Sequence, residues 1–137
     1  MIRLFLDTNI VIDMLQRREP FFLAAANIFA LSVSGNAELY VSPMTYATAS
    51  YLIGKRDIKK VKPLLSELRK FSHVTPTDET TIDKALLSDF EDFEDAMQYF
   101  SAFGLSMDYI ITRNKKDFIA SKVPVLTPEE FLQKQHN

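Results

Sequence analysis

Three short stretches of the 137-residue chain carry acidic side chains where a divalent metal ion could be bound. The first is Asp7, which follows the apolar run Arg3–Leu6 and precedes apolar residues at helical spacing. This pattern predicts that a buried strand ends at Asp7 and that a helix follows it. Because ligands of open α/β sheets gather outside the carboxyl ends of the strands, Asp7 is a candidate metal ligand. The alternative is that Asp7 only caps the helix, since aspartate is a preferred N-cap.

The second stretch is Asp92–Ala96, at the start of a helix predicted over residues 93–103. With Asp92 as the N-cap, Asp95 becomes the third helical residue, and both carboxylates lie at the same helix end. A capping interaction and the helix dipole can explain this pair without any function. However, six acids stand between residues 83 and 95 inclusive, which is more than capping requires. Clustered carboxylates repel one another, and a bound cation relieves that repulsion.

The third stretch, residues 112–118, follows an expected strand and should reach the same edge of the sheet as Asp7. Its Asn114 and Asp117 could supply oxygen ligands to a hard metal such as Mg²⁺ or Mn²⁺. Taken alone, such a turn is most often a solvated loop. The convergence of three acid-bearing stretches at one sheet edge favours a shared site. The same loop carries basic side chains that could contact phosphates, namely Arg113, Lys115 and Lys116.

Strand-like apolar runs alternate along the chain with segments of helical periodicity. This alternation is typical of a parallel sheet covered by helices on both faces. Pro124 favours an edge position for the last strand, because proline cannot donate to a sheet ladder. The expected strands are 3–6, 39–41, 72–74, 109–112 and 123–125, and helices are expected at 9–16, 21–34, 43–55, from 57, from 77, at 93–103 and from 127.

Individual residues add three local expectations. Gly35 suits a left-handed cap at the end of the second helix. Pro63 lies inside the apolar pattern of the fourth helix and should break or kink it. In the fifth helix, Ile82, Leu86 and Leu87 should face the interior.

Composition points to one soluble globular domain spanning residues 1–137. Without cysteine, the chain has no disulfide, thiolate zinc site or cysteine nucleophile, which suits a reducing cytosol. Met1 leads almost directly into the first expected strand, which leaves no room for a signal peptide. No apolar run approaches the ~20 residues that cross a bilayer. We therefore expect a cytoplasmic protein that does not associate with membranes.

Charge is distributed unevenly, although the net charge of −2 excludes a globally basic nucleic-acid binder. Seven basic residues lie between Lys55 and Lys70, and eight acids lie between Asp78 and Asp95. A basic face beside an acidic cluster could bind a polyanion near a divalent cation. The alternative is that both runs are solvated helix faces.

Other catalytic chemistries lack the necessary residues. The two histidines, His73 and His136, are too few for a histidine-rich zinc site and poorly placed for a histidine-dependent triad. The three glycines, at positions 35, 54 and 104, cannot form a glycine-rich phosphate loop of the P-loop or Rossmann kind.

Taken together, the three acid-bearing stretches resemble those of a PIN domain. The matching motifs are Leu-Asp-Thr-Asn-Ile at 6–10, Asp-Phe-Glu-Asp-Ala at 92–96 and Ile-Thr-Arg-Asn-Lys-Lys-Asp-Phe at 111–118, with the closing run 123–132 in the same pattern. The similarity is greatest to the bacterial branch related to VapC toxins, and it covers nearly the whole chain in the right order. It implies a PIN-like three-layer α/β/α sandwich with a central, mostly parallel five-stranded sheet.

The resemblance also implies a metal-dependent ribonuclease, in which acids bind Mg²⁺ or Mn²⁺ and a metal-bound water attacks an RNA phosphodiester. A small antitoxin protein and a homodimer are the partners that the family suggests. Carried over by motif, the catalytic acids would be Asp7, Asp95 and Asp117, with Asp92 and Asn114 completing the metal shell. The residues on the RNA side would be Thr8, Asn9, Thr45, Thr48, Thr112, Arg113, Lys115 and Lys116.

One position departs from the family pattern. Many such nucleases carry a glutamate early in the helix after the second strand, where this chain has Thr48. Thr45 and Thr48 offer neutral hydroxyls, so the site would hold one negative charge fewer and bind metal more weakly. A subgroup of the family commonly lacks this glutamate. The alternative interpretation is therefore a non-catalytic RNA- or protein-binding module on a degenerate PIN scaffold.

Overall fold

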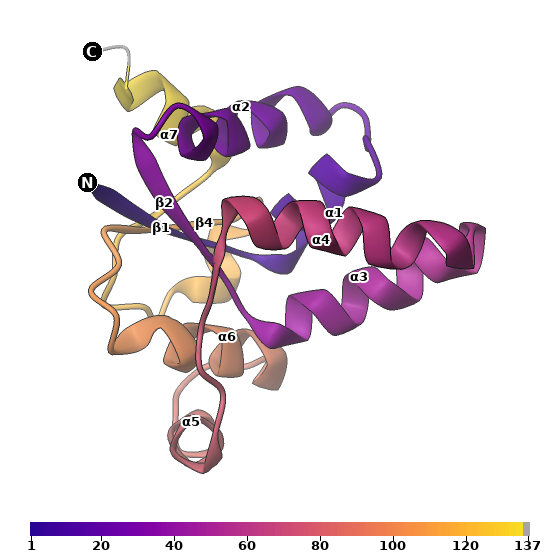
Figure 1. The fold of residues 1–137 in the computed structure, drawn as a ribbon. Helices are drawn as coiled ribbons and strands as arrows, with labels where there is room; N and C mark the ends of the chain where they lie inside the picture. The colour runs from indigo at the N-terminus through magenta and orange to yellow at the C-terminus, as the bar shows by residue number, and fades with distance from the viewer. Residues whose placement is uncertain (136–137) are drawn as a thin grey trace.

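A parallel β-sheet forms the centre of the computed structural model, which describes residues 1–135 (Figure 1). Five strands lie in this part of the chain, and every neighbouring pair is parallel. Their order is β3-β2-β1-β4-β5, which confirms the expected α/β architecture and its five-stranded sheet. The strands are β1 (Ile2–Leu6), β2 (Ala37–Val41), β3 (His73–Val74), β4 (Tyr109–Ile111) and β5 (Val125–Leu126).

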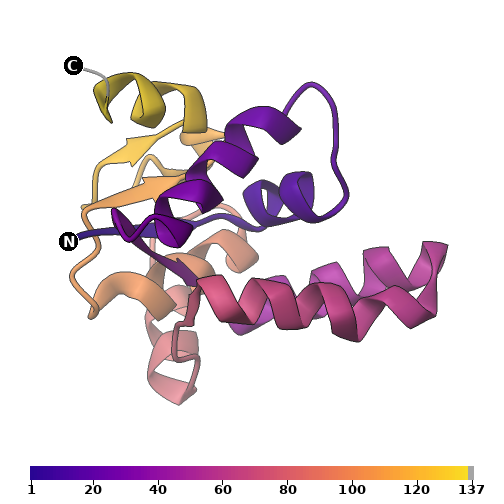
Figure 2. The ribbon, with the colours of Figure 1, turned by 45° about the horizontal axis from the view of Figure 1, so that its top comes forward.

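Helices cover both faces of the sheet, with α2 and α7 on one side and α6 on the other (Figure 1). α3 and α4 form an antiparallel hairpin that extends away from the sheet (Figures 1 and 2). The α-helices are α1 (Thr8–Leu15), α2 (Phe22–Val33), α3 (Pro43–Arg56), α4 (Val61–Phe71), α5 (Glu79–Leu86), α6 (Phe93–Phe103) and α7 (Pro128–Gln135), and two 3-10 helices are η1 (Ile58–Lys60) and η2 (Lys115–Phe118).

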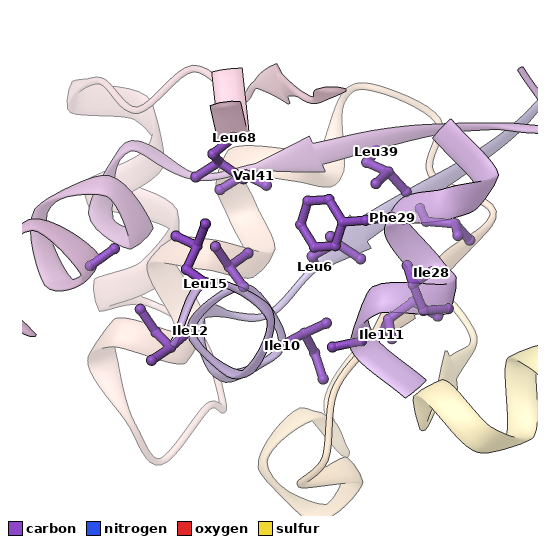
Figure 3. Close-up of a cluster of buried hydrophobic side chains, with 14 of the residues drawn as sticks. Leu6, Ile10, Ile12, Leu15, Ile28, Phe29, Leu39, Val41, Leu68 and Ile111 are labelled. Atoms are coloured by element: carbon purple, nitrogen blue, oxygen red, sulfur yellow. The ribbon is translucent and has the colours of Figure 1, made fainter. Parts of the chain in front are cut away.

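The two faces of the sheet bury separate hydrophobic clusters, because successive strand residues point in opposite directions. Leu4 and Leu6 of β1 belong to the larger cluster, which gathers side chains from α1, α2, α3, α4 and α7 (Figure 3). Phe5 points to the other face and packs with Tyr99 of α6 and Phe118 of η2. These side chains are almost fully buried, and each contributes about 1.5–3 kcal/mol of transfer free energy. The clusters fix β1, and therefore the residue at its carboxyl end, between the two helical layers.

Local signals in the sequence explain several element ends. Gly35 has a φ of 79°, as its predicted left-handed cap position requires, and lies just beyond α2. Pro124 immediately precedes β5, which is an edge strand as expected. No helix within residues 1–135 is long and apolar enough to cross a membrane. His136, one of the two histidines, lies outside the described residues.

Two local expectations are wrong. Pro63 does not break a helix, because the chain makes the separate turn η1 and begins α4 only at Val61. Proline is tolerated in a first helical turn, where its missing N–H has no intrahelical acceptor. Leu86 and Leu87 do not face the interior, since they are 66% and 88% exposed. α5 lies at the periphery and packs mainly against α6, so only part of its apolar face is covered.

Candidate active site

Asp7 occupies the carboxyl end of the central strand and is also the N-cap of α1. The residue is 6% exposed, and its carboxylate accepts three hydrogen bonds. The Thr8 N–H donates to Oδ1 over 2.8 Å, Gln98 Nε2 to Oδ1 over 3.2 Å, and Thr112 Oγ1 to Oδ2 over 2.8 Å. Burial raises the pKa of Asp7, against the opposing effect of these hydrogen bonds. The capping role and the sheet-edge position anticipated for Asp7 therefore coexist.

A hydroxyl–amide network connects Asp7 to α3 and α6. Thr8 Oγ1 lies 2.7 Å from Thr45 Oγ1 on α3, and it donates to Gln98 Oε1 on α6 over 3.2 Å. Thr45 is completely buried and Gln98 is 3% exposed. The network locks the orientation of the Gln98 amide, so that its Nε2 donates to Asp7.

Asp95 lies in the first turn of α6, next to the N-cap residue Asp92. Asp92 Oδ1 accepts the Asp95 N–H over 2.9 Å, so the carboxylate of Asp95 is not used for capping. Burial, followed by the negative charges of Asp7, Asp92 and Asp117, raises the pKa of Asp95 to about 7. Asp7 is the largest of these charge effects, which places the two carboxylates within electrostatic reach of one another.

Asp117 reaches the same region from η2, directly after β4. The Asn114 N–H donates to Thr112 Oγ1 over 3.1 Å, and the Asp117 N–H donates to the Asn114 carbonyl over 3.0 Å. This turn leaves Asp117 exposed, and its charge raises the pKa of both Asp7 and Asp95. A cavity of about 660 Å³ lies between α6 and η2 and is lined by Asp89, Phe90, Glu91, Asp92, Asp95, Lys116, Asp117, Ile119 and Ala120.

Two of the cations predicted to contact phosphates are bound to other carboxylates. Arg113 makes a bidentate pair with Asp13 of α1, with Nε–Oδ2 and Nη2–Oδ1 distances of 2.8 and 3.2 Å. Its guanidinium also stacks 3.8 Å from the centre of the Phe21 ring. Lys115 Nζ lies 3.0 Å from a carboxylate oxygen of Glu130. Both side chains therefore hold the loop after β4 to neighbouring helices.

The other predicted site residues differ in how near they lie to Asp7. Thr112 is fully buried and bonded to Asp7, as described above. Asn9 and Asn114 are partly buried at the start of α1 and of η2. Thr48 is exposed on α3, and the α3 hydroxyl that joins the network is that of Thr45. In this structure α3 therefore contributes a neutral hydroxyl to the site.

The donor chemistry of the site fits a hard divalent cation. Carboxylate oxygens from Asp7, Asp95 and Asp117 are of the type that Mg²⁺ and Mn²⁺ prefer. Burial, and after it the charges of neighbouring acids, raise the pKa of Asp7 and of Asp95 by disfavouring their ionised forms, which a bound cation would stabilise. As the side chains stand within residues 1–135, no three acids or histidines are close enough together to hold an ion. Binding therefore requires side-chain movement or water-mediated ligands.

Two polar residues of this region were missed by the sequence interpretation. Gln98 follows Asp95 by three residues, which places both on one face of α6. Asp13 is a lone acid inside the apolar run of α1 and is fully buried. An isolated polar residue at a core position was the available signal in each case, since a buried polar group needs a partner.

Comparisons with known proteins agree with this architecture. A PIN domain family model matches residues 3–116. The chain is 25% identical to Ribonuclease VapC1 of Aquifex aeolicus (strain VF5) over 137 residues, which cover 96% of this chain and 94% of that protein.

Solved structures show the same fold. A toxin-antitoxin complex from Klebsiella pneumoniae contains a chain with a TM-score of 0.66 and 21% identity, covering 90% of this chain and 96% of that one. VapBC-1 from nontypeable Haemophilus influenzae contains a chain with a TM-score of 0.65 and 20% identity, covering 93% and 99%. With its sequence matched over residues 3–116 and its fold shared with these structures, the chain belongs to the PIN domain family.

Proposed function

We propose that this protein is a divalent-metal-dependent endoribonuclease that hydrolyses RNA phosphodiester bonds. The observation that carries the proposal is the convergence of Asp7, Asp95 and Asp117, from β1, α6 and η2, on one edge of the sheet with mutually interacting charges. Membership of the PIN family and similarity to Ribonuclease VapC1 of Aquifex aeolicus support the same activity.

In this mechanism Asp7, Asp95 and Asp117 would hold the cation, and Asp92 and Asn114 would complete its surroundings directly or through water. When bound, Mg²⁺ or Mn²⁺ lowers the pKa of a water molecule and offsets charge on the reacting phosphate. Asp95 must lose the proton that it retains up to about pH 7 before it can act as a ligand.

Other side chains orient the acids and the substrate. Gln98 and Thr112 fix the carboxylate of Asp7, and Thr45 holds Thr8 in the same network. Lys116 lines the acidic cavity and is the cation best placed to contact an RNA phosphate there. Thr8 and Asn9, at the start of α1, are proposed to contact the substrate beside Asp7.

The proposal extends to the biological role. The solved complexes from Klebsiella pneumoniae and Haemophilus influenzae support a toxin that is held inactive by a small antitoxin protein. A homodimer and a cytoplasmic location, where cellular RNA is found, belong to the same proposal.

A second candidate function is a binding module without catalysis. The observation that favours it is that three donors of the chain itself already hydrogen-bond the Asp7 carboxylate, while α3 supplies a threonine and no acid. Such a module would bind RNA or protein equally well with and without divalent ions.

The deciding experiment is a cleavage assay on a structured RNA, with Mn²⁺, with Mg²⁺ and with a chelator. The proposed nuclease cleaves only with metal, and the variants Asp7→Asn and Asp95→Asn lose cleavage. The matched control Asp83→Asn, an exposed acid of α5, keeps it. Metal-independent binding without cleavage by the unaltered protein would instead establish the binding module.

A further inference from the structure

The outer end of the α3/α4 hairpin carries a dense group of cations, which we call the basic tip. It includes residues from the end of α3, from η1 and from the start of α4, and Arg17 from the turn that follows α1. All of these side chains are exposed. The basic tip consists of Arg17, Lys55, Arg56, Lys59, Lys60 and Lys62.

The charges of the basic tip are not neutralised within the protein. Among the described residues, none of its six side chains forms an ion pair. The nearby acid Asp57 accepts the Lys59 backbone N–H over 3.0 Å and caps η1. Six cations so close together repel one another, and this repulsion would be relieved by a polyanion.

The surface at the basic tip is hollowed rather than flat. A hollow of about 750 Å³ lies between the end of α1 and the hairpin, with Arg17, Arg56 and Lys60 in its lining. On another face of α3, Tyr51 is 65% exposed, and Nζ of Lys55, a member of the basic tip, lies 5.3 Å from the centre of its ring. Proteins that bind single-stranded nucleic acids combine exposed aromatic rings, on which bases stack, with neighbouring cations.

The cleavage site itself has few charges with which to hold RNA. Its cavity is lined by five acids and Lys116, whereas Arg113 and Lys115 are paired with Asp13 and Glu130. A substrate with one negative charge per nucleotide therefore needs cations elsewhere on the protein. α3 connects the two regions, since Thr45 contacts Thr8, the residue after Asp7, and Arg56 lies eleven residues further along the helix, about 16 Å away.

We propose that the basic tip is an RNA-backbone binding site that holds the substrate outside the segment being cleaved. This inference rests on the proposed ribonuclease function for the identity of its ligand. The basic tip then provides most of the affinity for RNA and the dependence of that affinity on salt, and the acidic site carries out cleavage.

Fluorescence anisotropy with a labelled 20-nucleotide RNA hairpin, in chelator so that no cleavage occurs, tests the inference. The tip variant is Arg56→Gln/Lys59→Gln/Lys60→Gln. Its charge-matched control is Lys70→Gln/Lys122→Gln/Lys134→Gln, which alters exposed lysines on other parts of the surface. Circular dichroism melting of both variants establishes that they fold.

The tip variant should bind the hairpin about tenfold more weakly than the unaltered protein, and the slope of log affinity against log salt should fall by about 2 for three lost phosphate contacts. The control should stay within about twofold. Equal weakening of both variants would reduce the effect to net charge and overturn the inference, as would unchanged binding by the tip variant.

Cleavage kinetics separate this inference from the proposed function. With Mn²⁺, the tip variant should show a raised KM on the hairpin and an unchanged kcat. If the unaltered protein cleaves the hairpin and the tip substitutions leave KM unchanged, the proposed ribonuclease function is supported. The proposed RNA-binding role of the basic tip is then overturned. If the unaltered protein binds the hairpin but does not cleave it, and the tip variant loses this binding, the RNA-binding role of the basic tip is supported. The proposed ribonuclease function is then overturned.

Discussion

Asp7 and Asp13 are two buried carboxylates six residues apart, and their partners differ in charge. Asp13 is bound bidentately by Arg113, with Arg18 at 3.8 Å. Asp7 is held by the uncharged donors Thr8, Gln98 and Thr112. Burial raises the pKa of both carboxyls, but only Asp13 has cations that oppose the rise.

This difference separates a structural acid from a candidate catalytic one. Arg113 neutralises Asp13 inside the protein, so that pair needs nothing from solution. Asp7 is oriented but not neutralised, and Asp95 and Asp117 add further negative charge beside it. A protein that leaves carboxylates in this state has a site suited to an external cation.

The largest expected effect is on catalysis. Asp7→Asn should lower RNA cleavage by about a thousandfold, because several kcal/mol of metal-dependent stabilisation are lost. The fold should survive, since the amide keeps the size of the carboxylate and removes a buried charge. Cleavage rates and thermal melting of the same preparation check both parts. Full activity of a folded Asp7→Asn protein would show that Asp7, like Asp13, is a structural acid and not a catalytic one.

The next largest effect is on stability. Asp13→Leu should lower the free energy of unfolding by about 3 kcal/mol, because it leaves the Arg113 guanidinium partly buried without its partner. The double variant Asp13→Leu/Arg113→Met should recover most of this loss. Urea unfolding of both variants measures the coupling. A double variant as unstable as the single one would show that the pair is not the source of the stability.

A third effect is the pH dependence of the metal-free protein. The carboxyl of Asp95 ionises near pH 4 in the unfolded chain but at about pH 7 in the folded one. Between these values the folded protein binds more protons, so the free energy of unfolding should fall as pH rises from 4 to 7. Asp95→Asn should flatten this profile.

The stabilisation of the protein by bound metal should increase as the pH rises, whereas the free energy of unfolding of the metal-free protein should fall. At pH 8, Mn²⁺ at a hundred times its Kd should stabilise the protein by about 2.7 kcal/mol, and the effect should fade below pH 7 as Asp95 is protonated. Melting curves at several pH values, with and without Mn²⁺, test this expectation. Stabilisation that stays constant down to pH 5 would exclude Asp95 as a ligand.

The smallest effect concerns the missing acid of α3. Thr48→Glu should raise Mn²⁺ affinity several-fold, up to about tenfold, if the longer side chain reaches the site from its exposed position. Thr48→Gln, which has the same length but no charge, is the control. Isothermal titration with Mn²⁺ compares them, and equal affinities for both variants would place residue 48 outside the metal site.

The sequence was most informative about the elements that carry the acids. An apolar run ending at Asp7 and an N-cap at Asp92 predicted β1 and α6 because both signals are local. The positions of Leu86 and Leu87 were wrong because burial depends on which elements pack nearby, and α5 is covered mainly by α6.

The contacts that separate Asp7 from Asp13 were beyond local patterns. The Arg113–Asp13 pair joins residues 100 positions apart, and the Gln98–Asp7 bond joins residues 91 apart. The direction of the Arg113 side chain, towards Asp13 of α1, depends on how the sheet folds. In the sequence alone, a basic residue in a loop after a strand is as well suited to contact a phosphate as to pair with an acid. The sequence pattern predicted that the acids lie at one edge of the sheet. It did not predict which of their charges are neutralised by basic side chains of the protein.

Anomalous X-ray diffraction from crystals soaked in Mn²⁺ tests the central claim most directly. The account predicts one manganese peak per chain, contacting the carboxylates of Asp7 and Asp95 directly or through one water molecule, with no peak beside Asp13. Crystals soaked in saturating Mn²⁺ that show no manganese peak shared by Asp7 and Asp95 would contradict the proposed metal site.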